Sequence, residues 1–231
     1  MSRILEQIKN VDWANNLSVA NNSSELFEKA EESQIKLALW CKQIENLYIG
    51  NAALPFIREA QVSSQDFFCL LSLGIYKASA SSLRTIIESF LYFSYFKDHL
   101  VELRTLSEDS SYYTSKKEIL DYHNLHSIGF KDKAHNTGFK KDIEDFYSKI
   151  SAIVHGQKPG VWHSSSCLTE KCFNSKIAEE AGNDFVKLIE VINILMLMII
   201  SDEDWANIPI RSRQVFIKGM NKSRKDHLNR Y

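Results

Sequence analysis

The sequence predicts an all-α protein, namely a helical bundle of about four to five core helices with N-terminal and basic C-terminal helical extensions. Turn-forming residues are scarce, since the chain has only 8 glycines and 3 prolines among 231 residues, and few tight turns favour long helices. Apolar residues recur with helical spacing over long stretches, and no stretch of strand length alternates strictly between apolar and polar residues. Hydrophobic residues make up 44% and charged residues 25% of the chain, which excludes a mainly disordered, collagen-like or low-complexity protein.

The helices of the first half are expected where the apolar spacing is helical. A short helix is predicted over residues 2–10, followed by a polar, asparagine-rich loop over 15–24. A strong helical pattern runs over 25–48 and is interrupted at Gly50. A second long pattern begins just after residue 62 and continues to about Phe96, so that one long helix is expected there.

The second half alternates between polar loops and helices. Loops are predicted over 107–116, over the basic stretch 129–138 and over 157–175. Helices are predicted over 117–123, over 139–155, where Gly156 follows as a helix-ending glycine, over 176–200, and from about Ile210 onward. The apolar run 191–200 is shorter than the roughly 20 residues that span a bilayer, so it predicts a buried helix and no membrane partner. We divide the chain into an N-terminal arm (1–22), a helical bundle (23–206) and a basic C-terminal arm (207–231).

Charge is unevenly distributed along the chain. The formal net charge is −1, but the segment 207–231 carries a net charge of +6, which leaves −7 on the first 206 residues. A basic segment of this kind indicates a polyanion or an acidic protein as partner, or a helix that lies over the acidic body of its own chain. Six of its residues are candidate RNA-binding residues, through phosphate contacts: Arg211, Arg213, Lys218, Lys222, Arg224 and Lys225.

The N-terminal residues and the cysteines predict a cytoplasmic protein. The first sixteen residues contain no apolar segment of signal-peptide type. The four cysteines, Cys41, Cys69, Cys167 and Cys172, include no CxxC pair, so we expect reduced thiols.

The first candidate site residues are a charged pair in a mostly apolar helix. Arg84 and Glu88 lie four residues apart and therefore on one face of the predicted helix. Removing one partner of a buried pair costs roughly 3–5 kcal/mol, so we expect the two charges to face each other or a polar group on a neighbouring helix. A structural salt bridge and a cation held ready in a groove are both consistent with this pattern.

The second candidate is a histidine at the end of the helix predicted over 139–155. His155 shares a polar face with Ser148 and Ser151, opposite the apolar face of that helix. Histidine accepts and returns protons near neutral pH, although a solvated histidine at a helix end is the simpler interpretation.

The two segments together resemble the HEPN-like all-α superfamily. The resemblance covers roughly residues 67–200 and depends on Arg-x-x-x-Glu at Arg84 and Glu88, and on Tyr-Ser-x-x-Ser-x-x-Val-His-Gly, which ends at His155 and Gly156. It implies a helical bundle that forms a homodimer, acts in prokaryotic antiviral defence or toxin–antitoxin systems, and in catalytic members cleaves RNA at the dimer cleft without a metal ion or other cofactor.

The family motif places an arginine four to six residues before the histidine, and here the sequence departs from it. The position five intervening residues before His155 is Lys149, which keeps the charge but lacks the planar fork of arginine. The catalytic candidates are therefore His155 as acid or base, Arg84 and Lys149 as phosphate ligands, and Glu88, which orients Arg84.

Other interpretations of the sequence remain open. A zinc site formed by His155, His163, Cys167 and Cys172 lacks a paired knuckle motif. Asp121, His123, His126 and His135 form a second candidate cluster of metal ligands, which a polar surface helix and loop explain equally well. Tyr92, Phe93, Tyr95 and Phe96 form an aromatic cluster more typical of a core than of base stacking. The alternative function is a non-catalytic subunit that binds and regulates a partner effector, with residues 185–200 and the basic arm as docking surfaces.

Overall fold

The computed structural model describes residues 2–162 and 166–230, and all regular structure within these ranges is helical. The prediction of an all-α protein is therefore confirmed. The elements are α1 (Arg3–Lys9), α2 (Trp13–Asn21), α3 (Ser24–Leu47), α4 (Leu54–Ser72), α5 (Tyr76–Phe96), α6 (Leu100–Glu108), α7 (Lys116–His126), α8 (Phe130–Thr137), α9 (Phe139–Val154), the 3-10 turn η1 (Leu168–Glu170), α10 (Ser175–Ile199), α11 (Asp202–Asn207), α12 (Ile210–Ile217) and α13 (Lys222–Leu228).

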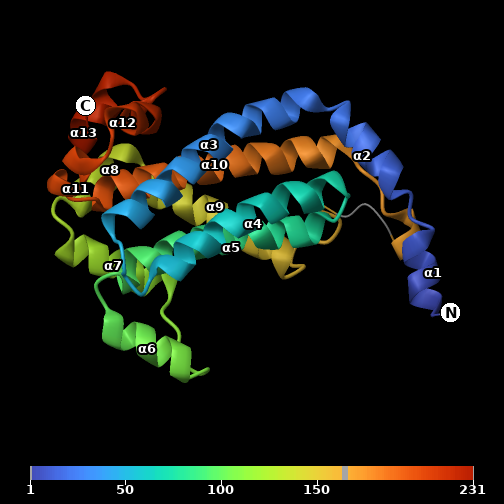
Figure 1. The fold of residues 1–231 in the computed structure, drawn as a ribbon, viewed down its shortest axis with the longest axis horizontal. Coiled ribbons are helices and arrows are strands. Elements are labelled where there is room, and N and C mark those ends of the chain that lie inside the picture. The colour runs from blue at the N-terminus through green and yellow to red at the C-terminus, as the bar shows by residue number, and fades with distance from the viewer. Residues whose placement is uncertain (1, 163–165, 231) are drawn as a thin grey trace.

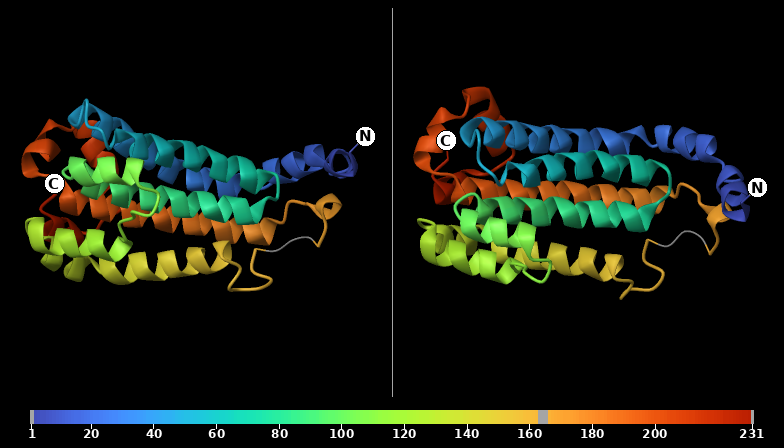
Figure 2. Two further views of the ribbon diagram at one scale, coloured as in Figure 1. Left: turned by 90° about the horizontal axis from the view of Figure 1, so that it is seen from below. Right: turned by 60° about the horizontal axis from the view of Figure 1, so that its bottom comes forward.

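The long helices α3, α4, α5, α9 and α10 run along the long axis of an elongated bundle (Figure 1). Helices α4 and α5 form an antiparallel hairpin, and α10 packs against α3, α5 and α9. Helices α1 and α2 lie at one end, and α11, α12 and α13 gather at the other (Figure 2). This layout places α5 and α9 next to each other, which determines where the candidate site residues meet.

Helices α5 and α10 contribute the largest shares of the core. Leu83, Ile86, Ile87 and Phe90 of α5 are fully buried, and most of α10 from Phe185 to Met198 is buried. The expectation of a helix buried on most sides is confirmed for α10. As a result, residues 185–200 are core and not a docking surface, which corrects that part of the alternative interpretation. Within the described ranges, no helix combines the length and the apolarity needed to cross a membrane.

The basic C-terminal segment packs closely against the bundle. The ring of Phe216 stacks on Trp40 of α3 at a centroid distance of 3.8 Å. Buried Asn193 of α10 accepts a hydrogen bond from Trp40 Nε1 (2.8 Å) and donates one to the carbonyl oxygen of Phe216 (2.9 Å). Asn193, which interrupts the apolar run, thus links α10 to α3 and α12 through hydrogen bonds, because a buried amide requires partners.

The last described residue of this segment, Arg230, is buried and not a surface cation. Its guanidinium donates to the carbonyl oxygens of Leu197 (3.3 Å) and Ile200 (2.6 Å) at the end of α10, and pairs with Asp202 (2.6 Å). Arg230 therefore supplies donors to carbonyl groups that a helix end leaves without intrahelical partners.

Two segments predicted as loops are helices, and both predictions were wrong. Within 15–24 the chain forms α2, which begins after Asp12, whose side chain accepts from the backbone N–H of Asn15 (2.9 Å). Buried Asn16 of α2 binds the backbone at Leu73, Lys171 and Phe173, so its amide is used in tertiary contacts rather than in a loop. Residues 129–138 form α8, bounded by two glycines in the left-handed conformation.

The single long helix expected over about 62–96 is also wrong, because the chain reverses at Gly74 between α4 and α5. Gly74 has φ +73°, and a Cβ atom there would lie 2.4 Å from the carbonyl oxygen of Cys172. Only glycine fits this turn, since it has no Cβ atom and accepts positive φ.

Candidate functional site

The packing of α5 against α9 brings Arg84, Glu88 and His155 together. Arg84 and Glu88 lie one turn apart on α5, which is otherwise largely buried. His155 caps the C-terminus of α9, and Gly156 then ends the helix with φ +69°. A guanidinium on a core helix therefore meets an imidazole at a helix end.

Four side chains form one hydrogen-bonded cluster at this place. Arg84 Nε donates to Glu88 Oε1 (2.9 Å), and Arg84 Nη1 contacts His155 Nε2 at 2.5 Å. The Tyr147 hydroxyl donates to Glu88 Oε1 (2.7 Å) and accepts from Arg84 Nη2 (3.3 Å). Glu88 thus orients Arg84, the role predicted from the spacing on α5, and Tyr147 of α9 braces both residues.

The contact between Arg84 and His155 defines the protonation of the ring. A guanidinium has only donors, so Nε2 of His155 must accept in this contact. The ring proton then lies on Nδ1, which is the neutral tautomer with its lone pair on Nε2. An imidazole in this form can act as a general base once the guanidinium moves away.

The cluster lies at the boundary between core and solvent. The side chains of Arg84 and Glu88 are 25% and 34% exposed, and His155 is exposed. Burial lowers the pKa of Arg84, but the hydrogen bond and the charge of Glu88 outweigh this effect and the pKa is raised overall. Burial, together with the hydrogen bond to Glu88, raises the pKa of Tyr147, so the tyrosine remains a neutral donor.

A cavity of about 430 Å³ opens beside this cluster, between α5, α7 and α9. Arg84, Glu88 and Tyr147 line one side, and Tyr113 and Lys116 line another. The Lys116 ammonium lies over the Tyr147 ring, 4.7 Å from its centroid. The cluster therefore borders a space of the size that small ligands occupy.

Lys149 is not brought to this cluster. Its ammonium pairs with Glu180 (2.9 Å) and Asp184 (2.7 Å) of α10. Burial lowers the pKa of Lys149, but the hydrogen bonds to Asp184 and Glu180 outweigh burial and raise it overall. The structure thus places Lys149 in a structural ion pair between α9 and α10.

The candidate RNA-binding residues lie at a distance from the cluster. Arg224 Nη2 donates to the carbonyl oxygen of Thr137 (3.0 Å), just before α9 begins, whereas His155 follows the end of α9. Sixteen residues of α-helix span about 24 Å. The basic C-terminal segment and the Arg84–His155 cluster therefore occupy opposite ends of α9.

Several of these cations also have partners within the chain. Lys218 pairs with Glu32 of α3 (2.6 Å), and the guanidinium of Arg213 lies over the Trp205 ring at 5.9 Å. Arg211 and Lys222 are exposed, and Lys225 is half-buried. In part, the basic segment therefore covers its own bundle, which was one of the two interpretations left open.

The fold does not support either of the metal sites considered from the sequence among the residues that the structure describes. Within the described residues, no group of three or more His, Cys, Asp or Glu side chains is arranged to hold a metal ion. His163 of the zinc hypothesis lies outside those residues. His123 is buried and bonded to Ser94 and Ser127, so it is structural.

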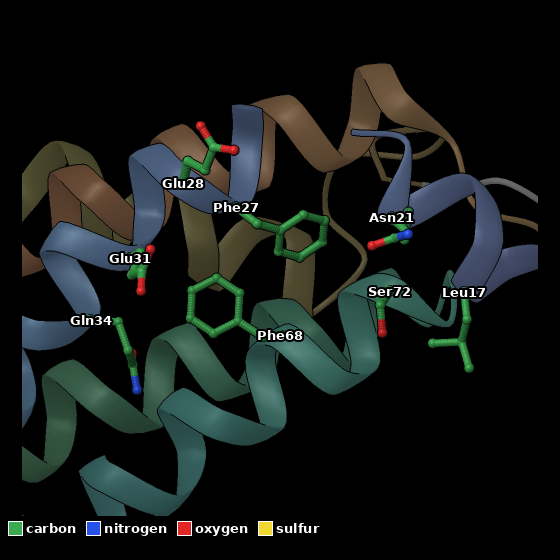
Figure 3. Close-up of a pocket in the computed structure, with 9 residues that line it drawn as sticks. Leu17, Asn21, Phe27, Glu28, Glu31, Gln34, Phe68 and Ser72 are labelled. Carbon is green, nitrogen blue, oxygen red and sulfur yellow. The ribbon is translucent and has the colours of Figure 1, made fainter. Parts of the chain in front are cut away.

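A second cavity of about 530 Å³ lies between α2, α3 and α4 (Figure 3). The rings of Phe27 and Phe68 lie 6.3 Å apart in its wall, and Glu28 and Glu31 add two carboxylates. Among the residues that the structure describes, no Lys, Arg or His lines this cavity. A phosphate would be repelled there, so this cavity does not compete with the Arg84–His155 cluster for RNA.

Tyr147, Lys116, Lys117 and Tyr113 are not among the candidates named from the sequence. Tyr147 was visible as the first residue of the Tyr-Ser-x-x-Ser motif. The sequence indicates the two lysines more weakly. They occupy the first turn of a helix that begins at a Ser115–Glu118 capping box, and the helix dipole disfavours cations in a first turn. Nothing in the sequence marks Tyr113.

The fold and the cluster together define a class, an all-α bundle with a guanidinium, an imidazole and a carboxylate at one solvent-facing edge. No protein-family model matches this chain, and comparisons with curated proteins and with solved structures give no match either.

Proposed function

We propose that this protein is a HEPN-like endoribonuclease that cleaves RNA without a metal ion, acting in the cytoplasm in antiviral defence or as part of a toxin–antitoxin system. The observation that carries the proposal is the contact between Arg84 and His155 across α5 and α9. It joins a fixed cation to a neutral imidazole, the two groups that cleavage by an internal nucleophile requires.

In the proposed reaction the RNA supplies its own nucleophile. Nη1 of Arg84 exchanges its contact with the imidazole for one with the scissile phosphate, while Glu88 and Tyr147 hold Nε and Nη2 of the same guanidinium. Nε2 of His155 removes the proton from the 2′-hydroxyl, the 2′-oxygen bonds to phosphorus, and the bond to the 5′-oxygen breaks. The products are a 2′,3′-cyclic phosphate and a 5′-hydroxyl.

The departing 5′-oxygen needs a proton, and the cluster contains a single imidazole. We therefore propose a homodimer in which His155 of a second copy supplies this proton.

The test is cleavage of a fluorescent single-stranded RNA by the purified chain in EDTA, with analysis of the product ends. General acid–base catalysis contributes about 10²–10⁴-fold, so His155→Ala should reduce the rate by this factor. Arg84→Ala should reduce it by about 10²–10³-fold, the loss typical of one charge-stabilising donor. His126→Ala, which changes an exposed histidine on α7, is the matched control and should retain full activity. Undiminished cleavage by His155→Ala would eliminate the catalytic role.

A second function, a non-catalytic subunit that regulates a partner effector, is favoured by two observations. The polar groups of Arg84, Glu88 and Tyr147 satisfy one another, as they would in a purely structural network. Apolar side chains are exposed on α6, such as Val101 at 68%, and in the connection between α7 and α8, such as Ile128 at 94%, and exposed apolar side chains can contact a protein partner. Absence of cleavage by the chain alone, and its onset when a partner is added, would favour this function.

A further inference from the structure

The cavity beside the Arg84–His155 cluster combines aromatic rings with cations. Tyr92 of α5, Tyr113 of the loop before α7 and Tyr147 of α9 line it, together with Lys116 and Lys117. Aromatic rings stack on nucleobases, and cations bind phosphates. Its volume of about 430 Å³ falls within the range of small-ligand sites.

The cavity is also positive. The charge of Arg84 is matched by Glu88, whereas none of the ion pairs among the described residues includes Lys116 or Lys117. Both lysines occupy the first turn of α7, where the helix dipole disfavours cations. Residues that are unfavourable for the local structure, such as these lysines in a first helical turn, occur most often at functional sites.

Tyr113 is the feature of the cavity that folding does not explain. Its side chain is 74% exposed, although Thr114 beside it is buried and anchors the loop. An exposed aromatic ring at the rim of a cationic cavity provides a face on which a base can stack.

From these observations we infer that the cavity between α5, α7 and α9 binds one nucleotide of single-stranded RNA next to the scissile phosphate. The base stacks on Tyr113, the scissile phosphate lies at Arg84, and the neighbouring phosphate lies at Lys116 and Lys117. Arg84 belongs to both the cavity and the contact with His155, so it connects this subsite to the reaction. The inference rests on the proposed function for its substrate, but its test does not require cleavage.

The experiment measures binding of a fluorescent 2′-O-methyl RNA hexamer to the full chain by anisotropy, because this RNA has no free 2′-hydroxyl and cannot be cleaved. Tyr113→Ala should weaken binding about 5- to 150-fold, the loss expected for one stacked base. The double variant Lys116→Ala/Lys117→Ala should reduce the slope of log affinity against log salt by about 0.7, since the two lysines contact one phosphate and each phosphate contact to a single strand contributes about this much. Tyr113 and Lys117 are exposed and Lys116 is half-buried, so the variants should fold normally, which circular dichroism would check.

The matched control is Lys140→Ala/Lys141→Ala, a pair of adjacent exposed lysines that line a different cavity, at the start of α9. This control should leave the affinity and the salt slope unchanged. If it weakens binding as much as the Lys116/Lys117 pair, or if Tyr113→Ala has no effect, the subsite does not exist. Binding of free uridine 5′-monophosphate and adenosine 5′-monophosphate is measured as well. If either mononucleotide binds as tightly as the hexamer, the assignment of the cavity to an RNA strand is overturned.

The outcomes separate this inference from the proposed function. Binding that depends on Tyr113 and the two lysines, without cleavage of normal RNA, would support the subsite and refute the nuclease. Cleavage that is unaffected by these variants would support the nuclease and refute the subsite.

Discussion

The protein should lose stability in mild acid through one buried histidine. His123 of α7 is 2% exposed, and its ring nitrogens bond to the hydroxyls of Ser94 (2.9 Å) and Ser127 (2.8 Å). The pKa of His123 is lowered from 6.5 to about 4, mainly by burial and also by the charges of Lys97 and His99, whereas Asp98 acts in the opposite direction.

The direction of the effect follows from proton uptake. Between pH 6.5 and 4 the unfolded chain binds a proton at His123 that the folded chain does not, so acid favours unfolding in this window. With these two pKa values, about 2 kcal/mol of stability present at pH 8 is lost by pH 5.

The measurement is guanidinium chloride unfolding at pH 8 and pH 5, followed by circular dichroism. His123→Gln should lose about 2 kcal/mol less than the natural chain between the two pH values, although it is less stable at pH 8. The control is His126→Gln, an exposed histidine on the same helix, which should behave like the natural chain. Equal acid losses in the natural chain and in His123→Gln would refute the reasoning.

Two further predictions concern packing. Arg230→Ala removes the donors to the carbonyl groups at the end of α10 and should cost about 2 kcal/mol, seen as a melting temperature about 4–8 °C lower; an unchanged melting temperature would mean that this role is wrong. Gly74→Ala places a Cβ atom 2.4 Å from the carbonyl oxygen of Cys172, whereas Gly50→Ala, at φ +82°, meets no atom within 4 Å. Chemical denaturation should therefore show a loss of about 1–2 kcal/mol for Gly50→Ala and a clearly larger one for Gly74→Ala, and equal losses would contradict the close approach.

Periodic patterns in the sequence predicted the long helices well. Residues 25–48, 139–155 and 176–200 correspond closely to α3, α9 and α10, because an apolar face that repeats every three to four residues has few other ways to be buried. Arg84 and His155, both named as candidates from the sequence, lie in contact in the structure.

The errors occurred where tertiary contacts outweigh local preference. Helix α2 is polar, and buried Asn16 binds backbone groups of two distant segments, which no local pattern reveals. The reversal at Gly74 depends on its close approach to Cys172, about a hundred residues further along the chain. Likewise, Lys149 matched a sequence motif, but the carboxylates that bind it belong to α10.

The two residues of the Arg84–His155 contact lie in backbone segments of different local stability. Arg84 extends from the middle of a core helix, whereas His155 belongs to the last turn of α9, beyond which the helical hydrogen bonds end. Helix ends open far more often than helix centres, so amide hydrogen exchange should be slow around residue 84 and fast around residue 155. The fraction of time in which base and cation are correctly aligned is therefore governed by the fraying of a single helix end, and a substitution that stiffens this end would change that fraction without touching either group.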